Sequence, residues 1–93
     1  MTFEWDEDKA QSNLAKHGVS FELASSVFED VFSFDYLDLD SDPGETRFMV
    51  IGFTNGIVLV VVYTERADRI RIISARRATI HEENEYYRSQ TIT

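Results

Sequence analysis

The sequence predicts an α+β domain built from an N-terminal helix pair, an antiparallel β-meander of about four strands and a closing C-terminal helix. Two observations carry this prediction. The dipeptide Asn55-Gly56 stands between two apolar segments of strand-like composition, which is a strong hairpin signal. Residues that cap helices stand near both ends of the chain and frame segments of helical length. Because the 93 residues contain no linker, repeat or low-complexity tract, we expect one domain over residues 1–93.

Cap residues place the predicted helices. Asp6 precedes a segment with two acids in its first turn, which predicts a helix that ends at His17-Gly18, with the glycine as its left-handed stop. The segment Thr79-Ile80-His81-Glu82 has the spacing of a capping box and predicts a last helix through about Arg88. Ser20 can cap a second helix, whose apolar face would consist of Phe21, Ala24, Val27, Phe28 and Val31.

Alternation of apolar and polar residues places the strands. A short first strand is indicated over residues 3–5, and the meander is predicted over residues 32–36, 46–54, 57–65 and 69–75. The stretch SDPGE, residues 41–45, reads as a loop, and a second tight turn is expected near Ala67-Asp68.

The turns also predict the strand register. If both hairpins have two-residue loops, Arg47 lies opposite Thr64, and Thr64 lies opposite Arg71, on one face of the sheet. Strands lie about 4.8 Å apart, so the two arginines would sit roughly 10 Å from each other. This spacing suits the binding of phosphates.

Charge is distributed unevenly along the chain. The net charge of −8 argues at first against nucleic acid, because binding a phosphate backbone normally requires a basic footprint. Residues 28–45 carry seven acids and no basic residue, whereas residues 46–77 carry six arginines against two acids. The net charge therefore combines an acidic segment and a basic segment, and we expect one surface of the protein to be cationic.

The composition excludes several kinds of site. Without cysteine, neither disulfides nor thiolate metal sites can form. The N-terminus lacks the pattern of a secretory signal, and the longest apolar run, Ile57–Tyr63, is too short to span a membrane. The acidic residues from Asp38 onward match only the first positions of an EF-hand, with Pro43 where that loop needs glycine. We expect a soluble cytoplasmic protein with no membrane contact, no metal site and no cofactor.

Four segments, taken together and in this order, resemble the BrnT family of bacterial toxins. They are EWDEDKAQSNLAKHGVSF, ETRFMVIG, VVYTER and RIRIISARRAT, and the resemblance covers about residues 3–86. It implies a RelE-like ribonuclease fold and metal-independent cleavage of RNA. It also implies inhibition by a BrnA antitoxin, whose ribbon-helix-helix domain would bind DNA so that the complex represses its own promoter.

The chain has the residue types that such chemistry needs. Attack of a 2′-hydroxyl on the adjacent phosphorus requires a base, an acid and cations that stabilise the transition state. Histidine suits the proton transfers near neutral pH, and arginine suits the phosphate through its planar set of donors. Lys9, Asn13, Lys16 and His17 fall on or near one stripe of the first predicted helix, which we expect to pack near the arginine-rich end of the sheet. The candidate catalytic residues are His17, Arg47, Glu65, Arg66, Arg71 and Arg76, and the candidate substrate-binding residues are Trp5, Lys9, Lys16, Arg69 and Arg77.

Several candidates have structural alternatives. His17 can simply favour a helix C-terminus, where a cation is stabilised by about 0.3–1 kcal/mol. Arg47 can bridge Glu45 or Glu65 in a purely structural ion pair, and Trp5 can belong to the core. Arginines on strands can also serve to protect an edge against aggregation.

The function has an alternative as well. In the family that the chain resembles, basic residues are common beside the position of Glu82, whereas this sequence has Ile80, His81 and Glu83 there. The alternative is a catalytically weakened binding module that chiefly partners the antitoxin.

Overall fold

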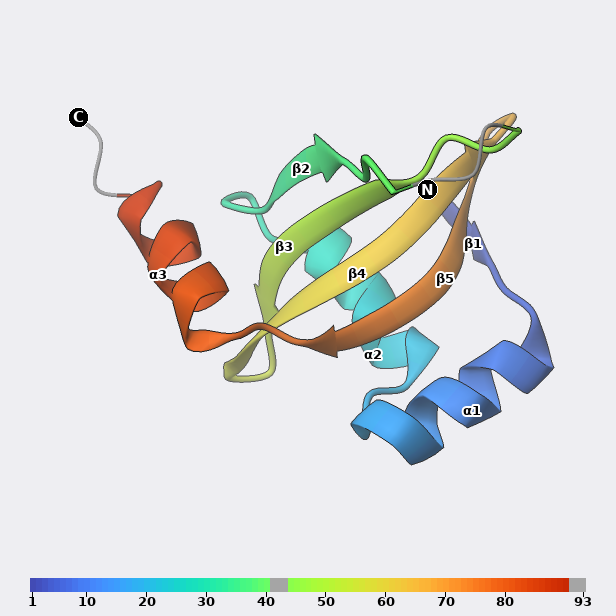
Figure 1. The fold of residues 1–93 in the computed structure, drawn as a ribbon, viewed down its shortest axis with the longest axis horizontal. Coiled ribbons are helices and arrows are strands. Elements are labelled where there is room, and N and C mark those ends of the chain that lie inside the picture. Colours follow the sequence, from blue (N-terminus) through green and yellow to red (C-terminus); the bar gives the residue numbers. More distant parts are fainter. Residues whose placement is uncertain (41–43, 91–93) are drawn as a thin grey trace.

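One five-stranded sheet organises the chain. The computed structural model describes residues 1–40 and 44–90. Its elements in chain order are β1 (Thr2–Glu4), α1 (Glu7–His17), α2 (Phe21–Ser25), the 3₁₀ turn η1 (Ser26–Glu29), β2 (Phe34–Leu37), β3 (Phe48–Thr54), β4 (Ile57–Arg66), β5 (Arg69–Arg77) and α3 (Ile80–Arg88). The strand order is β1-β5-β4-β3-β2, so that β2 to β5 form an antiparallel meander (Figure 1). β1 lies parallel to β5 at the other edge.

The α+β class and the closing helix are confirmed, and two details of the predicted arrangement are wrong. The meander is not the whole sheet, because β1 adds a fifth, parallel strand. The expected helix pair is reduced to α1 and the five-residue α2, which continues only as the 3₁₀ turn. The hydroxyls of Ser25 and Ser26 donate to the carbonyls of Glu22 and Leu23, a local competition that favours the end of a helix. Val31 therefore lies outside the helix and is 88% exposed.

The predicted caps are confirmed. The Asp6 carboxylate accepts from the amides of Asp8 and Lys9, and Gly18 ends α1 with φ 71°. At α3, Thr79 and Glu82 form both hydrogen bonds of the capping box. Of the predicted SDPGE loop, residues 41–43 lie outside the described residues.

The first predicted register is confirmed within the strands. Asn55 and Gly56 both have positive φ, as the tight hairpin turn requires, and β3 pairs with β4 in the expected register. Arg47 lies just before β3, whose ladder with β4 begins at the pair Phe48–Tyr63, and its carbonyl accepts from the Asp38 amide.

The second hairpin departs from its predicted register halfway along. Thr64 lies opposite Arg71 as expected, and the same register continues to the pair Tyr63–Ile72. The next pair is Val62–Ser74, so that Ile73 is an extra residue in β5. A β-bulge of this kind reverses the alternation of side chains beyond it.

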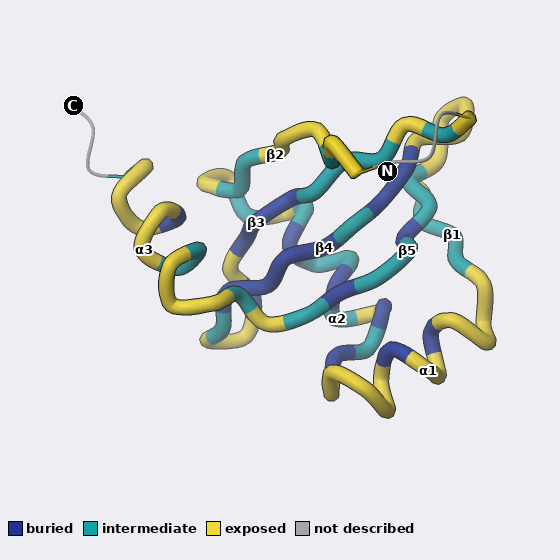
Figure 2. Tube along the Cα trace, in the orientation of Figure 1, coloured by how far each residue is buried: buried dark blue, intermediate teal, exposed yellow. Residues whose placement is uncertain are grey.

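The main core lies between the sheet and its N-terminal helices, on what we call the helix-covered face. Phe21, Ala24 and Val27 pack there against strand residues of which Leu59, Val61 and Ala75 are fully buried. Figure 2 shows the buried residues concentrated along β4 and on the inner sides of α1 and α2. Gly52 permits this packing, because a Cβ at its position would lie 3.0 Å from the Cβ of Val27.

A buried amide ties α1 to the edge of β5. The Nδ2 of Asn13 donates to the carbonyls of Ala75 at 2.8 Å and Val19 at 3.0 Å, and its Oδ1 accepts from the Ala75 amide at 3.1 Å. β1 pairs with β5 only from Arg69 to Arg71, so Ala75 lies where this edge has no strand partner. The side chain of Asn13 therefore takes the place of a neighbouring strand.

Asn13→Ala should lower the free energy of unfolding by about 2–4 kcal/mol, because it leaves buried backbone groups of Ala75 and Val19 without partners. Urea denaturation would measure the change. Gln11→Ala, on the exposed side of the same helix, is the matched control and should cost less than about 0.5 kcal/mol. Equal destabilisation by the two variants would contradict this role for Asn13.

Candidate functional site

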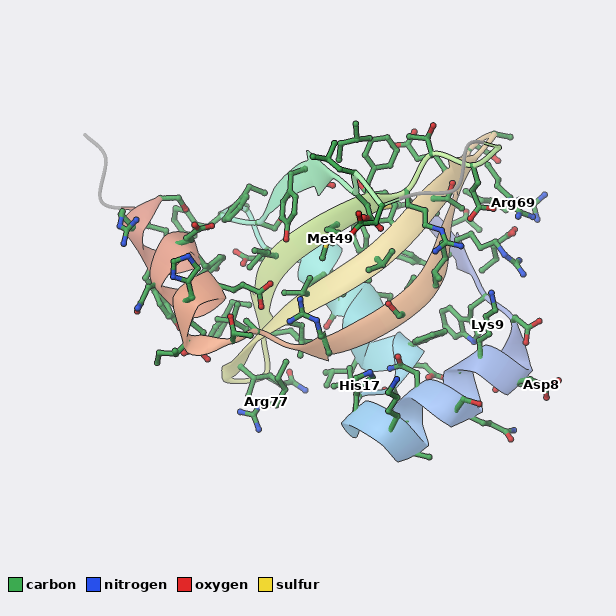
Figure 3. All side chains as sticks on the ribbon, in the orientation of Figure 1. Asp8, Lys9, His17, Met49, Arg69 and Arg77 are labelled. Carbon is green, nitrogen blue, oxygen red and sulfur yellow. The ribbon has the colours of Figure 1, made fainter. Side chains whose placement is uncertain are left out.

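The second sheet face is covered only in part, and we call it the open face. α3 packs over one end of it, where Tyr86 contacts the cluster of Ile51, Val58 and Val60. The rest faces the viewer in Figure 3, in which Met49 lies near its middle. The strand pairing places Glu4, Arg71 and Thr64 in one cross-strand row of this face.

The bulge decides which arginines share the open face. In the uninterrupted register, Arg77 would have fallen on the side of Val60 and Arg76 among the core residues. The extra residue exchanges the faces to which the side chains beyond it point. Arg76 therefore pairs with Val60 on the open face, while Ala75 pairs with Val61 and enters the helix-covered core. Arg71 and Arg76 consequently lie on the same face, four rows apart along β4, which corresponds to about 13 Å.

Glutamates hold the arginines near the β4–β5 turn. The two Glu4 carboxylate oxygens pair separately with Arg69 at 3.1 Å and Arg71 at 3.0 Å. Glu45 pairs in the same manner with Arg47 at 3.0 Å and with Arg66 at 3.8 Å. The structural alternative for Arg47, an ion pair with Glu45 or Glu65, is present in the structure with Glu45 as the partner.

Arg76 has the most specific partner on the open face. Its two terminal nitrogens bind the two Glu82 oxygens at 2.7 and 2.9 Å, and the Glu82 side chain also accepts from the Thr79 amide. The hydrogen bonds from Arg76 lower the pKa of Glu82 to about 2, against the opposing effect of burial. The pair joins β5 to the first turn of α3 and leaves 37% of the Arg76 side chain exposed.

Two tyrosine–aspartate hydrogen bonds fix the elements around the open face. The Tyr86 hydroxyl donates to Asp30, whose carboxylate also accepts from the amides of Phe32 and Phe53. The Tyr63 hydroxyl donates to Asp35 on β2. Burial and these hydrogen bonds raise the pKa values of both tyrosines. α3 and β2 are thereby anchored to the rest of the fold.

The candidate catalytic residue Glu65 lies at the end of β4 away from Arg76. It is exposed and lines a hollow of about 560 Å³ together with Gly44, Glu45, Thr46, Phe48, Thr64 and Arg66. Within the part of the chain that the structure describes, no arginine pairs with Glu65.

The structure does not bring His17 together with Arg47 and Arg71 in one cleft. α1 runs along β5 so that Asn13 lies beside Ala75, which puts His17 toward the Arg77 end of the strand, whereas Lys9 lies toward the Arg69 end (Figure 3). His17, Lys9 and Lys16 are exposed and have no ion pair among residues 1–40 and 44–90. The predicted cationic stripe is therefore interrupted by Asn13, which is buried for a structural reason.

Sequence reasoning also missed residues that the open face brings together. Trp5, a candidate for base stacking, packs edge-on against Phe21 at 5.9 Å beside the helix-covered core. The strand register puts two exposed aromatic side chains on the open face, Tyr36, which is 38% exposed, and Phe53, which is 41% exposed. The role of Glu4 as a partner of two arginines was not predicted, because only the parallel pairing of β1 with β5 reveals it. In the sequence, Phe34 and Tyr36 alternate with Asp35, and this pattern could have indicated that β2 presents two aromatic side chains on one face.

Two absences hold for the described residues. They contain no group of three or more side chains arranged to hold a metal ion. None of the helices formed by these residues has the length and apolar character needed to cross a membrane.

Glu82→Gln should reduce the free energy of unfolding at pH 7 by about 1.5–3 kcal/mol, since it removes a charged partner of Arg76 and keeps the capping hydrogen bond. The folded-state pKa of Glu82 lies below that of the unfolded chain, so its contribution is full above about pH 4.5 and is lost as the pH falls toward 2. Denaturation at both ends of this range would measure it.

The control is Glu83→Gln, which removes a charge from the same turn of α3 and should change stability by less than about 0.5 kcal/mol. A difference between wild type and Glu82→Gln that stays constant from pH 7 to pH 2.5 would refute the assigned contact.

Comparison with known proteins identifies the family. A family model described as the ribonuclease toxin, BrnT, of a type II toxin–antitoxin system matches residues 5–82, which is most of the chain. The curated proteins contain no match. The resemblance carried by the four sequence segments is thereby confirmed, and the matched region includes the whole of β5 and Glu82. The chain belongs to the BrnT family of ribonuclease toxins of type II toxin–antitoxin systems.

Proposed function

We propose that this chain cleaves RNA on the open face of its sheet as the toxin of a type II toxin–antitoxin pair. The observation that carries the proposal is the placement of Arg71 and Arg76 on one accessible face by the bulge in β5. Both side chains keep exposed surface while glutamates hold their guanidinium groups in place. Arginines held in this way can meet two phosphates of one RNA strand.

The arginines suit the transition state of RNA cleavage. The 2′-oxygen forms a bond to phosphorus and the bond to the 5′-oxygen breaks, which leaves a 2′,3′-cyclic phosphate and a 5′-hydroxyl. Negative charge increases on the phosphoryl oxygens during this step, and preorganised donors stabilise it. We propose that these donors replace a metal ion in the reaction.

His17 is our candidate for proton transfer. It is exposed, lacks an ion pair among the described residues and stands beside the end of β5 that carries Arg76 and Arg77. The second histidine, His81, instead lies 3.6 Å from Glu85 on the exposed side of α3. A neutral imidazole accepts a proton near neutral pH and returns it to the leaving oxygen.

A specific observation also favours the second candidate function, a catalytically weakened module that mainly binds its antitoxin. Three glutamates pair with five arginines, all of them on or beside the open face: Arg47, Arg66, Arg69, Arg71 and Arg76. A phosphate must compete with these carboxylates. The two candidates differ in whether expression without the antitoxin arrests growth.

The proposed partner is a BrnA-like antitoxin. It would neutralise the toxin by direct contact and supply a ribbon-helix-helix domain, so that DNA is bound only through the antitoxin and the complex represses its own promoter. The concentration of arginines between residues 46 and 77 makes the open face the natural docking place for an acidic antitoxin segment.

Purified protein should cleave RNA in excess chelator and leave cyclic phosphate or 3′-phosphate ends.

Arg71→Ala and Arg76→Ala should each lose at least tenfold in cleavage rate, since removing one preorganised donor to the transition state typically costs about 2.7–4 kcal/mol. Gel electrophoresis of labelled RNA would follow both effects. Activity that chelator abolishes and magnesium restores would end the metal-independent proposal.

Two controls separate catalysis from folding. Arg88→Ala removes an arginine from α3 away from the proposed site and should keep wild-type activity. Arg76→Ala leaves the Glu82 carboxylate without its arginine partner. The double variant Arg76→Ala/Glu82→Gln should therefore recover stability without recovering activity. Recovery of activity in the double variant would assign Arg76 a structural role only.

The antitoxin complex should protect the amides of β5 and α1 from hydrogen exchange, because the partner is expected to cover the cationic end of the sheet and the first helix. Mass spectrometry of the free toxin and of the complex would compare the two states. Protection confined to the acidic residues 28–45 would show that the antitoxin binds elsewhere.

A further inference from the structure

The open face carries an aromatic side chain for which the fold has no evident use. Tyr36 lies on β2, and its strand pairing with Met49 places it in a row with Val62 and Ser74. The residue is 38% exposed, and its ring lies 6.4 Å from the Phe34 ring, which packs against the cluster under α3. The Tyr36 ring is thus supported by Phe34 and still has accessible surface.

Its hydroxyl distinguishes Tyr36 from the structural tyrosines. Tyr63 and Tyr86 donate to Asp35 and Asp30 and are almost completely buried. In the described part of the chain, the Tyr36 hydroxyl has no hydrogen-bond partner. The contribution of this side chain to the fold is therefore small compared with that of the other two.

Tyr36 lies in the cross-strand row of Ser74, two residues before Arg76 on β5, and the charges of the Arg76–Glu82 pair act on it. Burial raises the pKa of Tyr36, the Glu82 charge raises it further and the Arg76 charge opposes this rise. Both ends of the ion pair are therefore close enough to influence the phenol. Met49 and Val62, both half-buried, form the floor between Tyr36 and β5.

We propose that Tyr36 is a stacking platform for an unpaired nucleobase, and that the site accordingly takes single-stranded RNA; this inference rests on the proposed function. A nucleotide whose phosphate contacts Arg76 can place its base over the apolar floor and against the Tyr36 ring. In a duplex, the faces of the bases are already stacked on their neighbours and are not available to a protein ring. An aromatic side chain on an open sheet beside arginines is an arrangement that binds single strands with little sequence preference.

Binding to probes that cannot be cleaved tests the platform separately from catalysis. The first probe is a fluorescent twelve-nucleotide RNA with 2′-O-methyl groups throughout, which lacks the attacking hydroxyl. The second probe is the same strand annealed to its complement. Fluorescence anisotropy gives the Kd of each, and thermal melting verifies that every variant is folded.

Tyr36→Ala should raise the Kd for the single strand at least fivefold, because stacking on one aromatic ring contributes roughly 5- to 150-fold to affinity. Tyr36→Phe should stay within about twofold of wild type, since it keeps the ring. Leu37→Ala is the matched control, because this neighbour, which is 50% exposed, points to the opposite face of β2 and should leave the Kd unchanged. The duplex should bind wild type and Tyr36→Ala equally.

Two results would overturn the inference in distinguishable ways. If Tyr36→Ala binds the single strand as wild type does while Arg71→Ala binds it more weakly, the platform is rejected and the proposed function stands. If wild type binds neither probe, RNA is not the ligand of the open face and the proposed function fails with the inference.

Discussion

The pairing of the Asn13 side chain with the backbone of Ala75 is the interaction on which the arrangement of this protein depends. The sheet needs a partner for β5 beyond the three residues that β1 covers, and a buried backbone without one costs about 1–3 kcal/mol per group. The amide supplies a donor and an acceptor at the spacing of a strand. α1 is thereby held against the edge of β5, and its exposed charges take fixed positions relative to the sheet.

The bulge at Ile73 connects this constraint to the open face. With Ala75 turned toward the helices, its small side chain is fully buried under α1 and α2, and the next residue has to point the other way. Arg76 therefore lies on the open face and forms an ion pair with Glu82 at the start of α3. A core requirement on one side of the strand thus determines which arginine is presented on the other side.

Local signals predicted the local features of this fold well. Caps at Asp6 and Thr79, the stop at Gly18 and the turn at Asn55-Gly56 all depend on neighbouring residues and are confirmed. The parallel pairing of β1 and the bulge depend on contacts between distant segments, which periodicity alone does not record. For this reason the pairing of Thr64 with Arg71 was predicted correctly, whereas the expectation of one cleft that includes His17 was wrong.

The ion pairs explain how an acidic chain can present a cationic face. Among the described residues, Glu4, Glu45 and Glu82 pair with arginines of that face, and the side chains of Arg71 and Arg76 remain 29% and 37% exposed. Such carboxylates have two opposing effects on a phosphate ligand, because they preorganise the guanidinium group and also compete for it. The balance depends on geometry: Glu82 occupies both terminal nitrogens of Arg76, whereas a single Glu4 oxygen meets one nitrogen of Arg71. Arg71 is consequently the arginine with more donors available to a phosphate, and Arg76 has the more rigidly defined position.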